Sequence, residues 1–179
     1  NNIDENCNEL IDEDCNLLYT LSGKVFIQGY YLSAGLMNSV LMNQNESGSS
    51  LICDSIQMEF HDAANISSIA YSAMLVLKTN GEFSLVGFPN SMLSNSYYIV
   101  IRHRNSIETW SANPVLILTN TMYDFTTAAS QAYGNNQIEI EPGVFAIYSG
   151  DLNQDGFIDS FDFPALDTDI FNGVNGVYV

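Results

Sequence analysis

The stretch that decides the fold is IAYSAMLVLKTNGEFSLVGF, residues 69–88. It contains two short apolar runs rich in β-forming residues, 69–79 and 82–88. Between them, residues 79–82 (TNGE) carry an Asn-Gly pair, which accepts the positive φ angles of a type I′ turn. The stretch therefore predicts a tight β-hairpin.

Similar apolar runs, separated by turn signals, continue on both sides of this stretch. No window keeps the 3.6-residue period of an amphipathic helix. About eight short strands in a body of roughly 130 residues predict an all-β fold, a two-sheet β-sandwich of about 7–9 strands. The further strand-like runs are 17–29, 51–62, 95–105, 114–120, 122–127 and 143–150.

The length and composition favour one ordinary domain with a real core, because the chain has 179 residues, of which 46 % are hydrophobic. No run of 18 or more apolar residues marks a membrane span, and the acidic first fifteen residues do not resemble a signal peptide. The formal net charge of −17 argues against a nucleic-acid partner, whose phosphates need clustered lysines and arginines.

The acidic residues gather at the two ends of the chain. Residues 1–15 hold six of the 21 acidic side chains and residues 151–169 hold another six, whereas the middle carries all four basic residues. We interpret the ends as cation sites, with solvated acidic tails as the alternative. The chain thus divides into an acidic cysteine-containing segment (1–16), a β-sandwich (17–150) and a second acidic segment with a tail (151–179).

The C-terminal acidic segment contains DLNQDGFIDSFD, residues 151–162. Calcium takes about six to eight oxygen ligands, and a tight loop supplies them from alternating positions. Gly156 stands at the sixth position, where such a loop turns sharply. The spacing predicts a calcium loop with Ile158 tucked into the body and with ligands Asp151, Asn153, Asp155, the Phe157 carbonyl, Asp159 and Asp162.

The first acidic segment repeats part of this spacing. Glu9 stands where the glycine would be, and Cys15 stands at the twelfth position, so Glu13 or Asp14 would have to close the loop. The alternative is an acidic linker pinned by a disulfide. The predicted ligands of this second calcium loop are Asp4, Asn6, Asn8, the Leu10 carbonyl and Asp12.

Two sets of motifs carry a resemblance to known modules. LKTNGEFSLVGF (77–88) followed by NSYYIVIRH (95–103) resembles immunoglobulin-like domains of the prealbumin or carboxypeptidase-regulatory type. Asp162, which replaces the glutamate of the usual EF-hand, is similar to the last ligand of dockerin loops, and FPALDTDIFNG (163–173) predicts one short helix after the loop. The second set is CNELIDEDCN (7–16), YYIVIRHRNSIETWS (97–111), YDFTTAASQAYG (123–134) and EPGVFAIYSGDLNQDGFID (141–159).

This second set resembles a module of large secreted bacterial surface proteins. In that family an Asp/Asn–Cys repeat, an immunoglobulin-like sandwich and a dockerin-like calcium segment follow one another. The resemblance implies an extracellular, non-catalytic module with an immunoglobulin-like sandwich and calcium-binding loops at both ends.

The three cysteines are Cys7, Cys15 and Cys53, an odd number that leaves one without a partner in the chain. We favour a disulfide between Cys15 and Cys53, with Cys7 pairing outside this chain. A Cys7–Cys15 disulfide and buried free thiols are the alternatives.

No catalytic constellation is recognisable, so we predict that the chain is not an enzyme. It has two histidines and no G-x-S-x-G elbow. The arginines of RHRN (102–105) are interpreted as ion-pair partners of Glu59, Glu108 or Asp124 rather than as a ligand clamp, because an unpaired buried arginine is costly. Trp110 is interpreted as a core residue rather than as a sugar-binding platform.

Three positions are candidate glycosylation sites. Asn45 and Asn65 begin N-x-S sequons in predicted loops. Ser55 lies in the tripeptide DSI, which resembles the D-S/T-aliphatic acceptor of O-glycosylation in some bacteria.

These features predict a structural module or subunit of an extracellular bacterial surface assembly, namely a filament, a stalk or an adhesin segment, rigidified by calcium. Its partners would be neighbouring copies, adjacent modules of the same surface protein, or glycans. The tail NGVNGVYV (172–179) is apolar and β-prone, so it could add as a strand to a neighbour's sheet edge. The alternative is a carbohydrate-binding or dockerin-type targeting module of a secreted enzyme.

Overall fold

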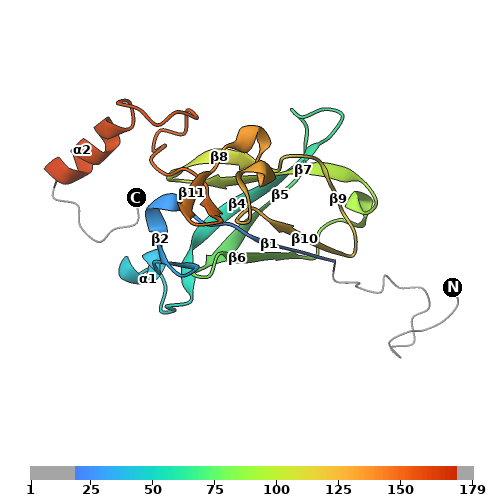
Figure 1. Ribbon diagram of the computed structural model, residues 1–179, viewed down its shortest axis with the longest axis horizontal. Coiled ribbons are helices and arrows are strands. Elements are labelled where there is room, and N and C mark those ends of the chain that lie inside the picture. Colours follow the sequence, from blue (N-terminus) through green and yellow to red (C-terminus); the bar gives the residue numbers. More distant parts are fainter. Residues whose placement is uncertain (1–18, 173–179) are drawn as a thin grey trace, which may run out of the picture.

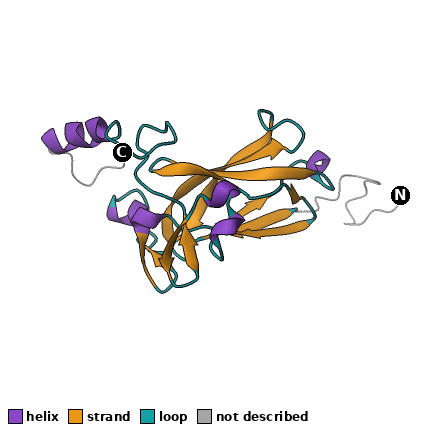
Figure 2. Ribbon diagram, turned by 45° about the horizontal axis from the view of Figure 1, so that its top comes forward, coloured by secondary structure: helices purple, strands orange, loops and turns teal. Residues whose placement is uncertain are grey.

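The computed structural model describes residues 19–172, and it confirms the predicted all-β sandwich. Two sheets lie one over the other, as Figure 1 and Figure 2 show. The smaller sheet contains β10 (Asn120–Asp124), β1 (Thr20–Lys24) and β6 (Glu82–Val86), in that order. The larger one contains β5 (Ile69–Lys78), β4 (Ile52–Asp62), β7 (Ser96–His103) and β8 (Ser106–Trp110), with β9 (Val115–Leu116) beside β7.

The larger sheet is antiparallel throughout, and β4 is its central strand. Met58 pairs with Ala73 of β5, and Phe60 pairs with Ile99 of β7. β4 is buried along most of its length, because it has a neighbour on each side and its outward face is also covered by side chains. The smaller sheet mixes directions, since β1 runs parallel to β10 and antiparallel to β6.

The core lies between the two sheets and is rich in aromatic residues. Phe26, Phe60, Phe83 and Phe125 are all at most 2 % exposed. Burying a side chain of this size stabilises the fold by about 1.5–3 kcal/mol. The strand β6 illustrates this burial, because Phe83 and Leu85 face the core while Glu82, Ser84 and Val86 face solvent.

The predicted hairpin at residues 79–82 is wrong. β5 pairs with β4, but β6 pairs with β1 in the opposite sheet, so the turn is a corner between the two layers. Gly81 has a φ of +84°, whereas Asn80 does not adopt a positive φ, which a type I′ turn requires at both positions. The corner is held because Gly81 N–H donates to the Lys78 carbonyl and the Gly81 carbonyl accepts from Val25 N–H, each at 2.9 Å.

Several short elements were not predicted, because they are too short to show a periodic pattern. The run 114–120 forms only the two-residue strand β9, and the run 17–29 forms β1 and then a 3₁₀ turn. The run 143–150 contains the short strand β12 (Val144–Ala146). The unpredicted elements are β2 (Tyr31–Ser33), β3 (Leu36–Met37), α1 (Val40–Asn43), β8, β11 (Ile138–Glu141) and the 3₁₀ helices η1 (Gln28–Tyr30), η2 (Asn90–Met92), η3 (Ala129–Gln131) and η4 (Tyr133–Asn135).

The helix predicted after the acidic loop is confirmed as α2 (Phe163–Phe171), with Pro164 in its first turn, where a proline is tolerated. Figure 1 shows α2 at one end of the sandwich and the start of β1 at the other. Within residues 19–172, no helix is long and apolar enough to cross a membrane.

Candidate functional site

The acidic loop 151–162 closes through its first and last residues. The Asp151 carboxylate accepts the N–H groups of Asp155 and Gly156, both at 3.1 Å. The Asp162 carboxylate accepts the N–H groups of Leu152 (2.8 Å) and Asp159 (2.9 Å) from across the loop. Both carboxylates are buried, at 2 % and 5 % exposure. Together they tie the two halves of the loop into one closed turn.

The N–H groups also fix the charge of Asp162. The N–H of Asp159, with those of Asn153 and Leu152, holds the pKa of the Asp162 carboxyl below its ordinary value, against a smaller raising effect of burial. Asp162 therefore stays ionised at neutral pH, which is the state that a cation needs.

The other predicted calcium ligands are exposed. Asn153 Oδ1 accepts from Asp155 N–H, Asp155 Oδ1 from Phe157 N–H and Asp159 Oδ1 from Phe161 N–H, at 2.7–2.9 Å. The side chains thus cap successive turns of the loop. Among residues 19–172, no three acidic, histidine or cysteine side chains converge closely enough to hold a metal ion. Calcium binding therefore remains a prediction from the spacing, with an oxygen-rich closed loop as its observed basis.

The loop is attached to the sandwich on its N-terminal side. Gly150 N–H donates to the Asn105 carbonyl at 3.0 Å and to its side-chain oxygen at 3.1 Å. Gln154 Nε2 donates to the Ser106 carbonyl of β8 at 3.4 Å, and within the loop to the Asp151 carbonyl at 2.5 Å. Ile158 contacts Gly150 but is 46 % exposed, so the prediction that it tucks into the body is wrong: the loop stands out from the sandwich and covers only part of this side chain.

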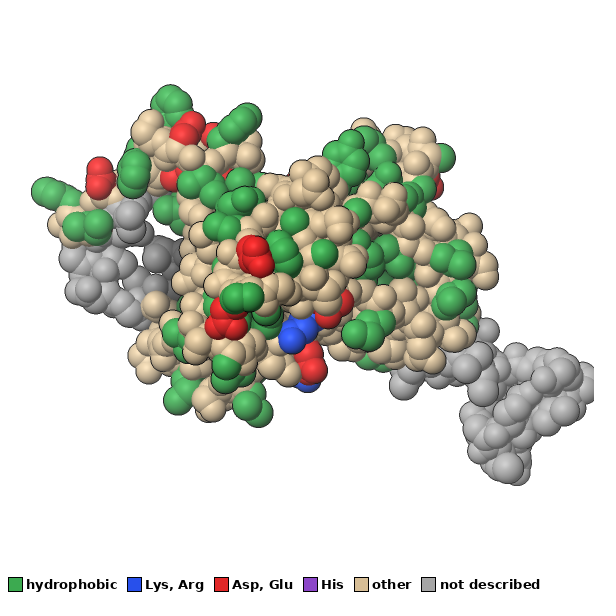
Figure 3. Space-filling model, viewed as in Figure 1, with side chains coloured by type: hydrophobic (Ala, Val, Ile, Leu, Met, Phe, Trp, Pro, Cys, Tyr) green, Lys and Arg blue, Asp and Glu red, His purple; other side chains and the backbone are tan. Residues whose placement is uncertain are grey.

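The acidic loop and the helix α2 that follows it expose a series of large apolar side chains. Figure 3 shows hydrophobic and acidic side chains side by side on this part of the surface. A solvated acidic segment would not need such residues. The exposed fractions are 69 % for Phe157, 72 % for Phe161, 57 % for Phe163, 67 % for Ile170 and 90 % for Phe171.

The predictions that concern the chain ends lie outside the described residues. They are the N-terminal calcium loop (Asp4, Asn6, Asn8, Leu10 and Asp12), the cysteines Cys7 and Cys15, and strand addition by residues 173–179.

Cys53 is a free cysteine in the structure and lies on the central strand β4, with no exposed surface. Burial, aided by the nearby Asp54 carboxylate, raises the pKa of its thiol to about 12. Because Cys15 is not among the described residues, the Cys15–Cys53 disulfide stays a prediction.

The candidate glycosylation sites differ in access. Asn45 and Asn65 are exposed in loops, as predicted. Ser55 is half-buried on β4, in a groove beside Gln57 and Met74.

The predicted ion pairs of RHRN (102–105) are confirmed for two of the three named acids. Arg102 contacts Glu59 at 3.1 Å and Glu108 at 2.5 Å on the outer face of the larger sheet. Asp124 instead accepts Thr126 N–H at 2.7 Å, because it lies at the end of β10 in the other sheet. Arg104 pairs with Asp54 at 3.0 Å, a partner that the sequence did not indicate.

His61 lies in the same outer-face network. Its Nε2 is 2.9 Å from a Glu59 carboxylate oxygen, and its Nδ1 is 2.7 Å from the Ile66 carbonyl. Both partners are acceptors, so both ring nitrogens must donate and His61 is an imidazolium in this arrangement. Burial raises the pKa of Glu59, but the hydrogen bonds from His61 and Arg102 outweigh it and hold that pKa below its ordinary value.

The other histidine, His103, faces the core and is held as a neutral tautomer. Its Nδ1 accepts Asn105 N–H at 3.2 Å and lies 3.2 Å from the Ser106 hydroxyl. Its Nε2 therefore carries the proton and donates to Asp54 at 3.2 Å. The order Ser106–His103–Asp54 resembles a catalytic relay, but Ser106 has no exposed surface. We therefore assign this relay a structural role, which is to satisfy buried polar groups.

An aromatic cluster on the outer face was also missed by sequence reasoning. Trp110 is half-buried rather than in the core, and it packs against Tyr98 and His61 with ring centroids 5.8 and 4.4 Å away. Trp110 Nε1 donates to the Glu108 carboxylate. Side chains alternate between the two faces of a strand, so residues an even number apart share a face. Tyr98 shares a face of β7 with Arg102, and Trp110 shares a face of β8 with Glu108, so this alternation could have indicated the cluster.

A comparison with protein-family models finds no match, and a comparison with curated proteins finds none either.

Proposed function

We propose that this chain is a non-catalytic structural module or subunit of an extracellular surface assembly, such as a filament, a stalk or an adhesin. In this proposal calcium braces the acidic loop, and the C-terminal segment joins the module to a neighbouring copy or an adjacent module. The immunoglobulin-like resemblance and the charge distribution of the sequence motivate the proposal.

The observation that carries the proposal is the combination of a closed acidic loop with exposed phenylalanines in one segment. Phe161, Phe163 and Phe171 are each more than half exposed. Large contiguous apolar surfaces are rare on soluble monomers and mark protein interfaces, and a short segment with several exposed phenylalanines is a candidate for such a surface. The segment therefore has the surface of an element that is covered in an assembly.

The arrangement of the chain also supports a module joined end to end. β1 starts at one end of the sandwich, and the acidic loop and α2 lie at the other, in both ribbon views (Figures 1 and 2). A force applied along such a chain would pass through the sandwich from end to end.

Calcium would be held by the oxygens of the acidic loop. The buried carboxylates of Asp151 and Asp162 stand at its first and last positions, and Asn153, Asp155, Asp159 and the Phe157 carbonyl complete an oxygen set of the kind that calcium prefers. When bound, the ion would offset the repulsion between these carboxylates and stiffen the junction. Millimolar calcium outside cells is in the range that such extracellular loops use.

The test is to measure molar mass by light scattering in about 2 mM calcium, the extracellular range, and again in a chelator. We expect multimers with calcium and monomers without it. The double variant Phe161→Ser/Phe171→Ser should remain monomeric in calcium while still binding the ion by calorimetry, and Asp162→Asn should lose both properties. Met122→Ser, at an equally exposed apolar residue of β10, serves as the matched control and should multimerise normally.

A wild-type chain that stays monomeric in calcium at every concentration would count against the assembly. A chain that multimerises equally in calcium and in chelator would count against the brace.

A further inference from the structure

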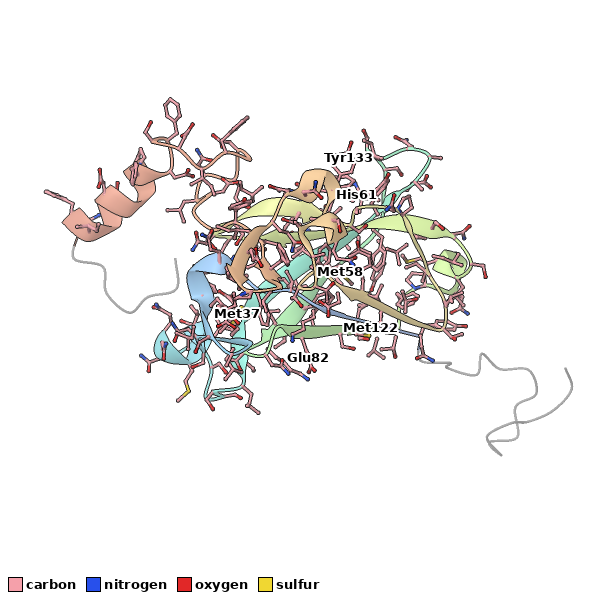
Figure 4. The ribbon with its side chains drawn as sticks, in the orientation of Figure 1. Met37, Met58, His61, Glu82, Met122 and Tyr133 are labelled. Carbon is pink, nitrogen blue, oxygen red and sulfur yellow. The ribbon has the colours of Figure 1, made fainter. Side chains whose placement is uncertain are left out.

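A small hollow lies on the outer face of the larger sheet, away from the acidic loop. It is lined by Ile66, Tyr98, Trp110 and Tyr133 and has a volume of about 270 Å³. Tyr98 comes from β7 and Trp110 from β8, whereas Ile66 comes from the loop after β4 and Tyr133 from η4. Figure 4 labels Tyr133 of this hollow and His61, whose ring packs against Trp110. Its lining is thus brought together from four separate parts of the chain.

Two of the three rings that line this hollow, those of Tyr98 and Trp110, are held in place before any ligand arrives. Tyr98 and Trp110 meet at 61°. Trp110 is fixed by its hydrogen bond to Glu108 and by the adjacent His61 ring. The side chain of Tyr133, by contrast, is 66 % exposed and is not part of the core. Fixed aromatic rings bind a ligand at little cost in conformational entropy.

The charges beneath the hollow cancel. Glu59 and Glu108 are matched by Arg102 and by the imidazolium of His61, with contacts of 2.5–3.1 Å. Excess negative charge would favour an organic cation beyond what the rings alone supply, and excess positive charge would favour an anion; neither excess is present here. The balance favours an uncharged ligand.

The loops that flank the hollow carry amides and hydroxyls. Asn65 and Ser67 adjoin Ile66, and Asn135 follows Tyr133 closely; all three are exposed. Aromatic rings with neutral hydrogen-bonding groups around them suit a ligand that has an apolar face and hydroxyl groups at its edge.

We infer that this hollow binds one uncharged pyranose residue of a carbohydrate, with the sugar ring against Trp110, Tyr98 and Tyr133. The apolar C–H face of a pyranose matches the aromatic lining, and its hydroxyls match the flanking amides. The inference goes beyond the proposed structural role and uses none of the residues on which that role rests. Either proposal can therefore be contradicted without affecting the other.

Trp110 is the single tryptophan of the chain, so its fluorescence reports on this site directly. The probes are the methyl glycosides of glucose, galactose, mannose and N-acetylglucosamine, and sorbitol is the control because it has hydroxyls but no ring face. We expect a saturable change with at least one glycoside and a dissociation constant of about 1 mM, as suits a ligand of this size. Sorbitol should give no change.

Variants separate binding from folding. Tyr133→Ala should weaken glycoside binding roughly three- to ten-fold, the loss of one aromatic contact, and Tyr133→Phe should restore it. Because Tyr133 is largely exposed, neither change should lower the melting temperature. Phe171→Ala, at an exposed aromatic residue of α2, should bind as the wild type does.

The inference is overturned if none of the four glycosides binds, or if sorbitol binds equally well. It is also overturned if a polyproline peptide or choline binds in their place, since either would make the hollow a site for a different class of ligand. Failure of calcium-dependent assembly would leave this result unaffected.

Discussion

His61 and His103 show how single residues of one type acquire different charges from their partners. His61 faces two acceptors, a carboxylate and a carbonyl, and is an imidazolium. His103 accepts a backbone N–H at Nδ1 and donates from Nε2 to Asp54, so it is neutral. His61 therefore belongs to an ion-pair network on the outer face, and His103 belongs to a chain of hydrogen bonds in the core.

The first prediction concerns Glu59, whose pKa is lowered in the fold. A lowered pKa stabilises the protein above the unfolded value of about 4.3 and loses that stabilisation as pH falls through the folded pKa. At pH 7, Glu59→Gln should therefore lower the free energy of unfolding by about 1–3 kcal/mol, because His61 and Arg102 lose a buried charged partner. Urea titration should show the difference shrinking below about pH 4.

Glu82→Gln is the matched control for this prediction. Glu82 also pairs with a basic residue, Lys78 at 3.2 Å, but both side chains are more than half exposed. Solvent screens such a pair, so the variant should unfold as the wild type does at pH 7. A Glu59→Gln penalty that is the same at pH 7 and at pH 3.5 would rule out the titration of Glu59 as its cause.

At the scale of elements, the corner at residues 79–82 decides which strands meet. Buried and exposed positions alternate along β6 and along the last residues of β5, and Leu77 and Phe83 end up facing the same core from opposite sheets. A hairpin would have placed these strands side by side in one sheet. The corner instead lets β6 pair with β1, where Leu85 faces Leu21.

The corner predicts a specific cost for a side chain at Gly81. A Cβ there would lie 2.8 Å from the Phe26 ring and 2.9 Å from the Val25 carbonyl, at a φ of +84°. Gly87 has a similar φ of +79° but open space around it. Gly87→Ala should thus lower the free energy of unfolding by about 1 kcal/mol from backbone strain alone, and Gly81→Ala by at least about 2 kcal/mol. Equal losses, measured by urea denaturation, would show that the space at the corner is not limiting.

At the scale of the whole molecule, the sandwich is organised around β4, which joins β5 and β7 and carries Cys53 toward the core. The Cys53 thiol has no exposed surface, so we expect it to reach solvent only when the domain opens. Its reactivity therefore reports on opening of the whole domain rather than on local motion.

In the reduced protein, an alkylating reagent should label Cys53 only after global unfolding, because the thiol is fully buried and its pKa is raised to about 12. Peptide mapping of labelled protein at increasing urea should place half-labelling of Cys53 at the unfolding midpoint. Rapid labelling of Cys53 in native buffer would contradict this placement. Mapping without reductant also tests the Cys15–Cys53 disulfide.

The candidate site was predictable only in part. The spacing of Asp151, Asp155, Asp159 and Asp162 is local, so the sequence alone indicated a closed oxygen-rich loop followed by a helix. The pairing of Arg102 with Glu59 and Glu108 followed from the cost of an unpaired arginine. The pairing of Arg104 with Asp54, and the meeting of Ile66 and Tyr133 over Trp110, depend on contacts between distant segments, which no local pattern encodes.

The sequence by itself determined the all-β class, most of the long strands and the acidic loop, because each follows from a pattern within a few neighbouring residues. The tertiary structure decided which strands share a sheet, that residues 79–82 turn a corner, and that Trp110 faces outward. The physical reason is that an Asn-Gly turn is compatible with more than one path of the chain, and the path taken is the one that buries Phe26, Phe83 and their neighbours in a single core.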